Sequence, residues 1–135
     1  MEQITKALSV ALEDRPGTLF KASDAIAKAG INIEGFCAVP AGKEGMLHVV
    51  TTDPKGTRKA LEGVGFKVKD ELDALVIDIQ DRPGALAGIL RPIADAEVNL
   101  AMTFSLIGNR IAFIGRDVAQ LRDIVHQAVP TAARS

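Results

Sequence analysis

The chain has 135 residues, of which 47% are hydrophobic and 24% charged, with a formal net charge of −1. This composition is typical of a globular protein, and it argues against a disordered chain and against a basic surface for nucleic acid. The single Cys37 excludes an intrachain disulfide, and no apolar stretch approaches the ~20 residues of a membrane span. We therefore expect a cytoplasmic protein that binds neither nucleic acid nor membrane.

The first part of the chain predicts a strand, a helix and two further strands. Residues 8–12 alternate with the period of two expected for a half-buried strand. A helix is expected between Asp14, as its N-cap, and Gly30, as its left-handed C-terminal residue. Strands follow from residue 31 to about 39 and over 46–51, on either side of a turn at 40–45.

The next segments complete one structural unit. Asp53 and Pro54 open a second helix that ends near Gly63 or Gly65, and residues 66–68 form a short strand. The order strand, helix, strand, strand, helix, strand is the split βαβ pattern. It predicts an antiparallel four-stranded sheet with two helices on one face.

The pattern then repeats. The motif Asp14-Arg15-Pro16-Gly17-Thr18-Leu19 returns 67 residues later as Asp81-Arg82-Pro83-Gly84-Ala85-Leu86, and 11 of the 27 positions in residues 7–33 are identical in residues 74–100. Each copy of such a repeat is one structural unit. We therefore expect an α+β chain of two ferredoxin-like βαββαβ units, residues 1–71 and 72–135.

The second copy follows the first except in two places. Pro92 lies inside the expected helix over about 83–96, so either this helix kinks or its limits are wrong. Strands are expected over 75–79, 98–106 and 110–114, the last two joined by a hairpin turn at Gly108-Asn109, and a helix capped by Asp117 follows. Residues 129–135 make a poor last strand. The second unit either lacks this strand or borrows it, and residues 66–79 are a segment that both units could share.

These residues resemble the ACT domain, a small ligand-sensing module. Its signatures, Asp-x-Pro-Gly-x-Leu and then Gly-x-Asn-Ile, read here as Asp14 to Leu19 and Gly30-Ile31-Asn32-Ile33. The resemblance covers nearly the whole chain. It implies a ferredoxin-like fold, and an amino acid or similar metabolite bound where two ACT units meet, between the loop before the first helix and the start of the second strand.

Carried over residue by residue, the resemblance implies ligand contacts in both copies. They are Asp14, Gly17, Thr18, Gly30 and Asn32 in the first copy, and Asp81, Gly84, Ala85 and Asn99 in the second. Free N–H groups at a helix N-terminus suit a carboxylate, and an asparagine amide both donates and accepts hydrogen bonds. Helix capping, turn geometry and local asparagine bonding are alternative reasons for the same residues. Glu97 replaces the glycine of the first copy, so we do not expect equivalent sites.

The sequence thus predicts a non-catalytic regulatory protein that binds an amino acid and signals to a partner enzyme or regulator. A homodimer would satisfy open sheet edges, and a ligand-free oligomerisation module is the alternative function. His48, His126 and Cys37 have no partner at catalytic or metal-ligand spacing, so we expect no enzyme, cofactor or metal. Apolar neighbours of the two asparagines favour an apolar amino acid; they are Ile31, Ile33, Val98 and Leu100.

Overall fold

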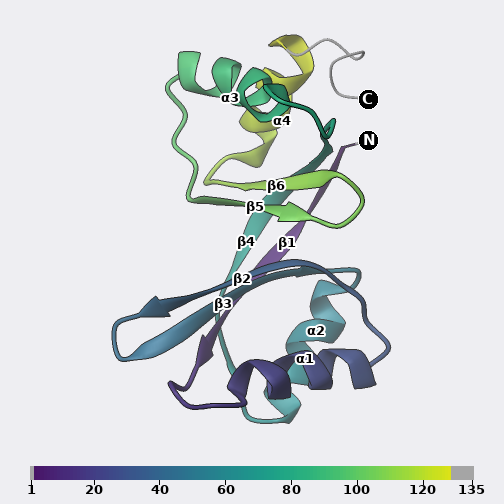
Figure 1. Ribbon diagram of the computed structural model, residues 1–135, viewed down its shortest axis with the longest axis vertical. Helices are drawn as coiled ribbons and strands as arrows, with labels where there is room; N and C mark the ends of the chain where they lie inside the picture. The colour runs from purple at the N-terminus through teal and green to yellow at the C-terminus, as the bar shows by residue number, and fades with distance from the viewer. Residues whose placement is uncertain (1, 129–135) are drawn as a thin grey trace. The chain divides into compact units, whose positions relative to one another are not determined.

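The computed structural model describes residues 2–128, which form an α+β fold with four helices and one six-stranded sheet (Figure 1). The elements in chain order are β1 (Gln3–Leu12), α1 (Thr18–Lys28), β2 (Ile33–Ala41), β3 (Glu44–Thr51), α2 (Pro54–Gly63), β4 (Lys67–Asp78), α3 (Ala85–Asp95), β5 (Met102–Leu106), β6 (Arg110–Ile114) and α4 (Val118–Ala128). The strand order in the sheet is β2-β3-β1-β4-β6-β5. Within residues 2–128, no helix is both long and apolar enough to cross a membrane.

The chain folds as two compact units, and both β1 and β4 contribute to each of them. One unit is Lys6–Leu72, here called the 6–72 unit. The other combines the described residues of Met1–Thr5 and of Asp73–Ser135, and is here called the 73–128 unit. β1 therefore changes unit after residue 5, and β4 changes unit after residue 72.

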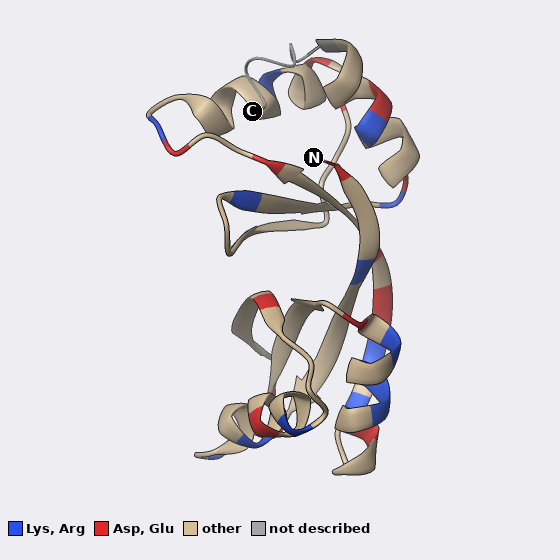
Figure 2. Ribbon diagram, turned by 90° about the vertical axis from the view of Figure 1, so that its right-hand side faces the viewer, with Lys and Arg blue, Asp and Glu red and all other residues tan. Residues whose placement is uncertain are grey.

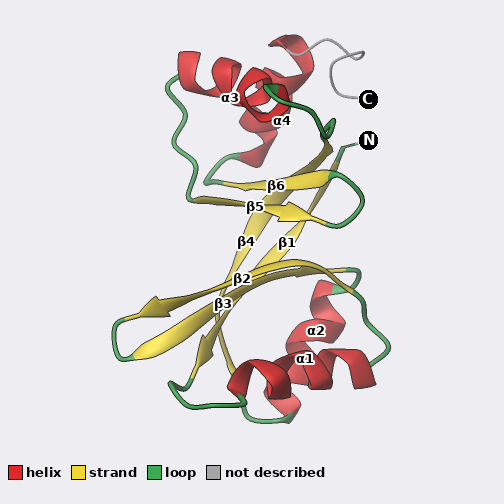
Figure 3. Ribbon diagram, viewed as in Figure 1, coloured by secondary structure: helices red, strands yellow, loops and turns green. Residues whose placement is uncertain are grey.

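In the 6–72 unit, α1 and α2 cover one face of the strands (Figure 3). β1 and β2 both pair antiparallel with β3, with Leu8 opposite Val49. The alternation in β1 sends every second side chain toward the helices, where Leu8 and Val10 are buried with Ile26 and Leu61. The expected strand over 8–12 is confirmed.

In the 73–128 unit, β4 and β5 pair antiparallel with β6, and α3 and α4 supply the helical layer. Its core contains Leu75, Ile89, Phe113 and Leu121. The first residues of β1, which lies next to β4 in the sheet, belong to this unit. The strand that the sequence left open is thus supplied from the start of the chain. The weak strand expected over 129–135 lies outside the described residues.

Strand limits differ from expectation in three places. The strands expected at 66–68 and 75–79 are one continuous strand, β4, because residues 69–74 contain neither glycine nor proline to break it. The turn expected at 40–45 shrinks to Gly42 and Lys43, with Gly42 at a φ of +68°. β2 and β5 begin later than predicted, at Ile33 and Met102.

The helix starts divide into two kinds. Asp53 and Asp117 are N-caps as predicted: each carboxylate accepts a main-chain N–H three residues on, both at 3.0 Å. The predicted caps at Asp14 and Asp81 are wrong. α1 and α3 instead begin after Gly17 and Gly84, whose φ angles of 90° and 85° place them in the left-handed region, without any side-chain cap.

Candidate functional site

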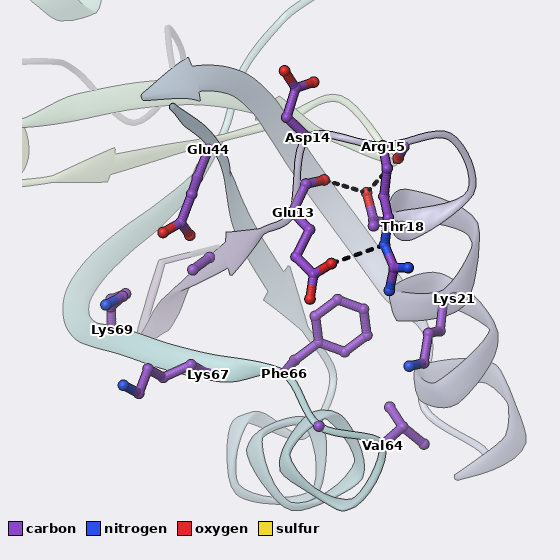
Figure 4. A pocket seen from close by; sticks show the side chains of 12 residues that line it. Glu13, Asp14, Arg15, Thr18, Lys21, Glu44, Val64, Phe66, Lys67 and Lys69 are labelled. Carbon is purple, nitrogen blue, oxygen red and sulfur yellow. Dashed lines mark hydrogen bonds and ion pairs between the residues drawn. The ribbon is translucent and has the colours of Figure 1, made fainter. Parts of the chain in front are cut away.

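A hollow of about 440 Å³ lies where β1 ends and α1 begins (Figure 4). We call it the β1–α1 hollow. All its lining residues belong to the 6–72 unit, and they come from the end of β1, the β1–α1 loop, α1, the start of β3, the turn after α2, and the start of β4. Its charged and polar side chains are those of Glu13, Asp14, Arg15, Thr18, Lys21, Glu44, Lys67 and Lys69.

The β1–α1 loop is fixed by its own hydrogen bonds. The Thr18 hydroxyl donates to the carbonyl of Glu13 at 3.1 Å, with the Arg15 carbonyl at 3.3 Å. The Arg15 Nε lies 2.8 Å from the Glu13 carboxylate in an exposed ion pair. The predicted residues Asp14 and Thr18 both line the hollow, on a loop that these contacts stabilise.

Besides Arg15, which is paired with Glu13, three lysines give the hollow its cationic groups. Lys67 and Lys69 flank the buried Val68 on β4, so the alternation of the strand places both on the same face. Lys21 lies across the hollow, with its Nζ 5.6 Å from the centre of the Phe66 ring (Figure 4). Within residues 2–128, none of these lysines is in an ion pair.

The remaining predicted residues of the 6–72 unit lie elsewhere. Gly17 starts α1, whereas Gly30, at a φ of +77°, follows its C-terminal end. Asn32 comes two residues later, and its main chain is hydrogen-bonded to Thr52. The 11 residues of α1 span roughly 16 Å at 1.5 Å per residue. This unit therefore does not bring Gly30 and Asn32 together with Asp14 and Thr18.

The 73–128 unit separates its predicted residues in the same way. Gly84 and the buried Ala85 start α3, after the exposed Asp81. Asn99 follows the other end of α3 and lines a second hollow of about 620 Å³, which we call the α3–β5 hollow. Its other polar residues are Glu97, Arg116, Asp117 and Gln120.

Sequence reasoning missed the three lysines of the β1–α1 hollow and Arg116 of the α3–β5 hollow. The alternation Lys67-Val68-Lys69 was a readable signal, because two lysines two apart on a strand share a face. Arg116 had a weaker signal, namely its position beside the cap residue Asp117. Further basic residues lie along α2, outside the β1–α1 hollow (Figure 2).

Both histidines have a defined partner, and that of His126 is the carboxylate of Glu2, 2.8 Å from its Nε2. His48 lies opposite Ser9 in the pairing of β3 with β1, and the Ser9 hydroxyl is 2.8 Å from its Nδ1. Partial burial lowers the pKa of His48. Across residues 2–128, no group of three or more His, Cys, Asp or Glu side chains is placed to hold a metal ion.

Comparison with solved structures reveals the same fold. Protein BT0572 from Bacteroides thetaiotaomicron is similar with a TM-score of 0.80 and 26% identity, over 93% of this chain and 89% of that one. The ligand-free regulatory subunit of aspartate kinase from Thermus thermophilus gives 0.68 and 18%, over 96% and 97%. Escherichia coli aspartokinase III in complex with lysine and aspartate gives 0.56 and 15%, over 96% and 33%.

A comparison of the sequence with known families and proteins finds a match for part of the chain. None of the curated proteins compared matches it. The model of the ACT domain matches residues 6–62. These residues lie within the 6–72 unit and include the β1–α1 loop, and the chain as a whole shares its fold with the solved structures named above.

Proposed function

We propose that this chain is a non-catalytic regulatory protein of two ACT units, corresponding to residues 1–71 and 72–135, which binds an amino acid and signals to a partner enzyme or regulator. The ACT match over residues 6–62, the repeat of its motif at Asp81, and the fold shared with a regulatory subunit support this proposal. The similar aspartokinase III structure holds amino acids.

The composition of the β1–α1 hollow is the observation that carries the proposal. An amino acid presents a carboxylate and an ammonium group. Three lysines without ion-pair partners in the described chain offer cations, and Asp14 and Glu44 offer carboxylates. The volume of about 440 Å³ lies within the range of small-molecule sites.

Signalling requires a difference in affinity between two states of the protein. A ligand shifts a conformational equilibrium only by the ratio of its affinities for those states. We propose that the amino acid favours one arrangement of the ACT units, which a partner enzyme or regulator recognises.

A thermal-shift screen against the twenty standard amino acids tests this function. A ligand at 100 times its dissociation constant adds about 2.7 kcal/mol to the free energy of unfolding, a rise of several degrees for a chain of this size. We expect one or two amino acids to respond, and the response to be lost when Lys67 and Lys69 are both changed to Gln. The matched control is Lys55→Gln with Lys59→Gln on α2, outside the hollow. A folded protein without response to any amino acid contradicts the proposal.

The second candidate function is a ligand-free oligomerisation module. Phe20 and Phe36 are 71% and 55% exposed beside an apolar groove, and Phe36 lies on β2, an edge strand of the sheet. Exposed strand edges and apolar patches are sites of association. Light scattering tests this candidate: it predicts a homodimer that Phe20→Ser with Phe36→Ser converts to monomer, with no effect of amino acids on either.

A further inference from the structure

The sheet of the 6–72 unit has a second face, which points away from α1 and α2. The helices cover the other face, where Leu47 and Val49 of β3 are buried in the core (Figure 3). Because side chains alternate along a strand, Met46 and His48 of β3 lie on the face away from the helices. This face therefore carries a thioether and an imidazole two residues apart on one strand.

The pairing of the strands adds a thiol and a hydroxyl to the same face. Ser9 of β1 and Cys37 of β2 both lie opposite His48, one on each side of it, and Met46 lies opposite Val39. Directly opposite residues have Cβ atoms about 4.5–5.5 Å apart, and diagonal neighbours about 7–8 Å, which a long side chain can span. Cys37, His48 and Met46 are therefore neighbours on this face.

Ser9 holds the histidine ring from its buried side. Ser9 is only 6% exposed, and its hydroxyl lies 2.8 Å from the Nδ1 of His48. When Nδ1 carries the ring proton and donates it to this hydroxyl, Nε2 keeps a lone pair for a metal ion. A histidine that binds a metal characteristically donates its other ring N–H to such a partner, which fixes the tautomer and the orientation of the ring.

The donor atoms on this face have no other use in the described chain. Within residues 2–128, the Cys37 thiol, the Met46 sulfur and the Nε2 of His48 make no hydrogen bond. All three side chains are half-buried, so an ion can reach them from solvent. The neighbouring residues of β2 and β3 on this face are uncharged; they are Gly35, Val39 and Val50.

We propose that Cys37, His48 and Met46 bind one soft monovalent metal ion of the Cu⁺ class. The ligands are the Cys37 thiolate, which gives up its proton on binding, the Nε2 of His48 and the sulfur of Met46. Thiolate and thioether sulfur select such ions, whereas Zn²⁺ is usually held by four nitrogen, oxygen or thiolate donors. Ser9 is the positioning residue for His48.

The geometry of paired strands suits this coordination. An ion bound to a thiolate and an imidazole at about 2.0–2.3 Å needs these two donor atoms about 3.5–4 Å apart, which opposite residues can provide. Cys37 and His48 are only two ligands of the His, Cys, Asp and Glu types, and the methionine supplies the third. None of the three residues lines the β1–α1 hollow, so this inference does not rest on the proposed function.

Titration of the reduced protein with Ag⁺ and, in the absence of oxygen, with Cu⁺ tests this site. The chain contains neither Trp nor Tyr, so thiolate-to-metal charge-transfer absorption in the ultraviolet is measured against a low background. We expect one ion per chain, with NMR shifts of the His48 ring protons and of the Met46 methyl group. The same signals of His126 and Met102 are internal controls and should not shift.

Variants separate a three-ligand site from a cysteine that binds metal alone. Cys37→Ser should abolish binding, while Met46→Leu and His48→Gln should each weaken it by about tenfold or more, measured by competition with a Cu⁺ chelator. The matched controls are Met102→Leu and His126→Gln, which should bind as tightly as the original protein. Amide spectra without metal show whether each variant keeps its fold, and Met46→Leu alone decides if His48→Gln does not fold.

Ser9→Ala tests the positioning role. It should weaken binding by about tenfold, and the ¹⁵N shifts of His48 should show loss of the Nδ1–H tautomer. Binding that is lost with Cys37→Ser but unchanged by Met46→Leu overturns this inference, as does one ion per two chains. Displacement of Ag⁺ by Zn²⁺ at equal concentration also overturns it. None of these measurements uses an amino acid, so this inference and the proposed function fail separately.

Discussion

Glu97 adopts a backbone conformation that the first copy obtains with glycine. Gly30 has a φ of +77° and Glu97 a φ of +57°, and each follows a helix end closed in the same way. The N–H of the next residue bonds to the carbonyl five residues back, at 3.3 Å to Ile26 in α1 and at 3.2 Å to Ile93 in α3. The two copies thus share a helix terminus, but the second uses a residue that disfavours it.

Glu97→Gly should raise the free energy of unfolding by about 0.5–1 kcal/mol. The left-handed conformation costs a non-glycine residue about 1–2 kcal/mol, and the added freedom of glycine in the unfolded chain offsets part of that gain. Gly30→Ala is the converse change and should cost about 1 kcal/mol, because its Cβ meets nothing within 4 Å and only the backbone is strained. Urea unfolding measures both. The two substitutions should change the free energy of unfolding in opposite directions. A Glu97→Gly variant that is less stable than the original protein contradicts this account.

His48 makes stability depend on pH. Burial lowers its pKa from the 6.5 of an unfolded chain, so the unfolded state takes up more protons as the pH falls below about 6.5. The free energy of unfolding should therefore decrease as the pH is lowered from 7.5 to 5. His48→Gln should flatten this decrease, as measured by urea unfolding at each pH. The variant still contains His126. If the decrease in stability at low pH is the same in His48→Gln as in the original protein, groups other than His48 cause it.

At the scale of the helices, an aspartate lies near the start of each of the four helices, but only two of these aspartates cap their helix. Asp53→Ala and Asp117→Ala each remove a side-chain hydrogen bond to an N–H, and should cost about 1 kcal/mol in chemical unfolding. Asp14→Ala and Asp81→Ala remove no such bond, and should change stability by less than about 0.5 kcal/mol. A large loss from Asp14→Ala would restore the capping role that the sequence predicted.

Local sequence patterns predicted most of the helices and strands. They failed where the limits of an element depend on residues outside the pattern. Period-two alternation placed β1, and the cap and proline at Asp53 placed α2. The helix over Ala85–Asp95 forms through Pro92, close to its expected limits. Asp14 misled because a glycine three residues later supplies the helix start by its backbone. Residues 69–74 contain neither glycine nor proline, so β4 is continuous, and its division between the two units agrees with the shared segment that the sequence suggested for residues 66–79.

At the scale of the molecule, the two units share their strands. Residues 3–5 of β1 belong with the 73–128 unit, and the rest of that strand with the 6–72 unit. A chain that begins at Lys6 should therefore lose about 1–3 kcal/mol of stability in the 73–128 unit, because β4 loses hydrogen bonds there. Hydrogen exchange measures this: the Leu75 and Ile77 amides should exchange faster. Amides of the 6–72 unit, such as Val49, are the internal control, and an equal change in both units contradicts the division.

The lining residues of the two hollows were predicted only in part, because the tertiary fold brings distant segments together there. The resemblance indicated Asp14, Thr18 and Asn99, and each lines a hollow of its own unit. It did not indicate Lys67, Lys69 or Arg116, which are brought beside those residues by segments distant in sequence.

The division of β1 between the units affects how the protein can fold during its synthesis. During synthesis, residues 2–5 leave the ribosome before all other residues of the 73–128 unit, and the strand they lie beside follows about 70 residues later. Until β4 has been translated, this end of β1 is an unpaired edge that another growing chain can take up. Slow translation between Leu12 and Lys67 should therefore increase aggregation of the nascent chain, a hazard that the finished molecule does not carry.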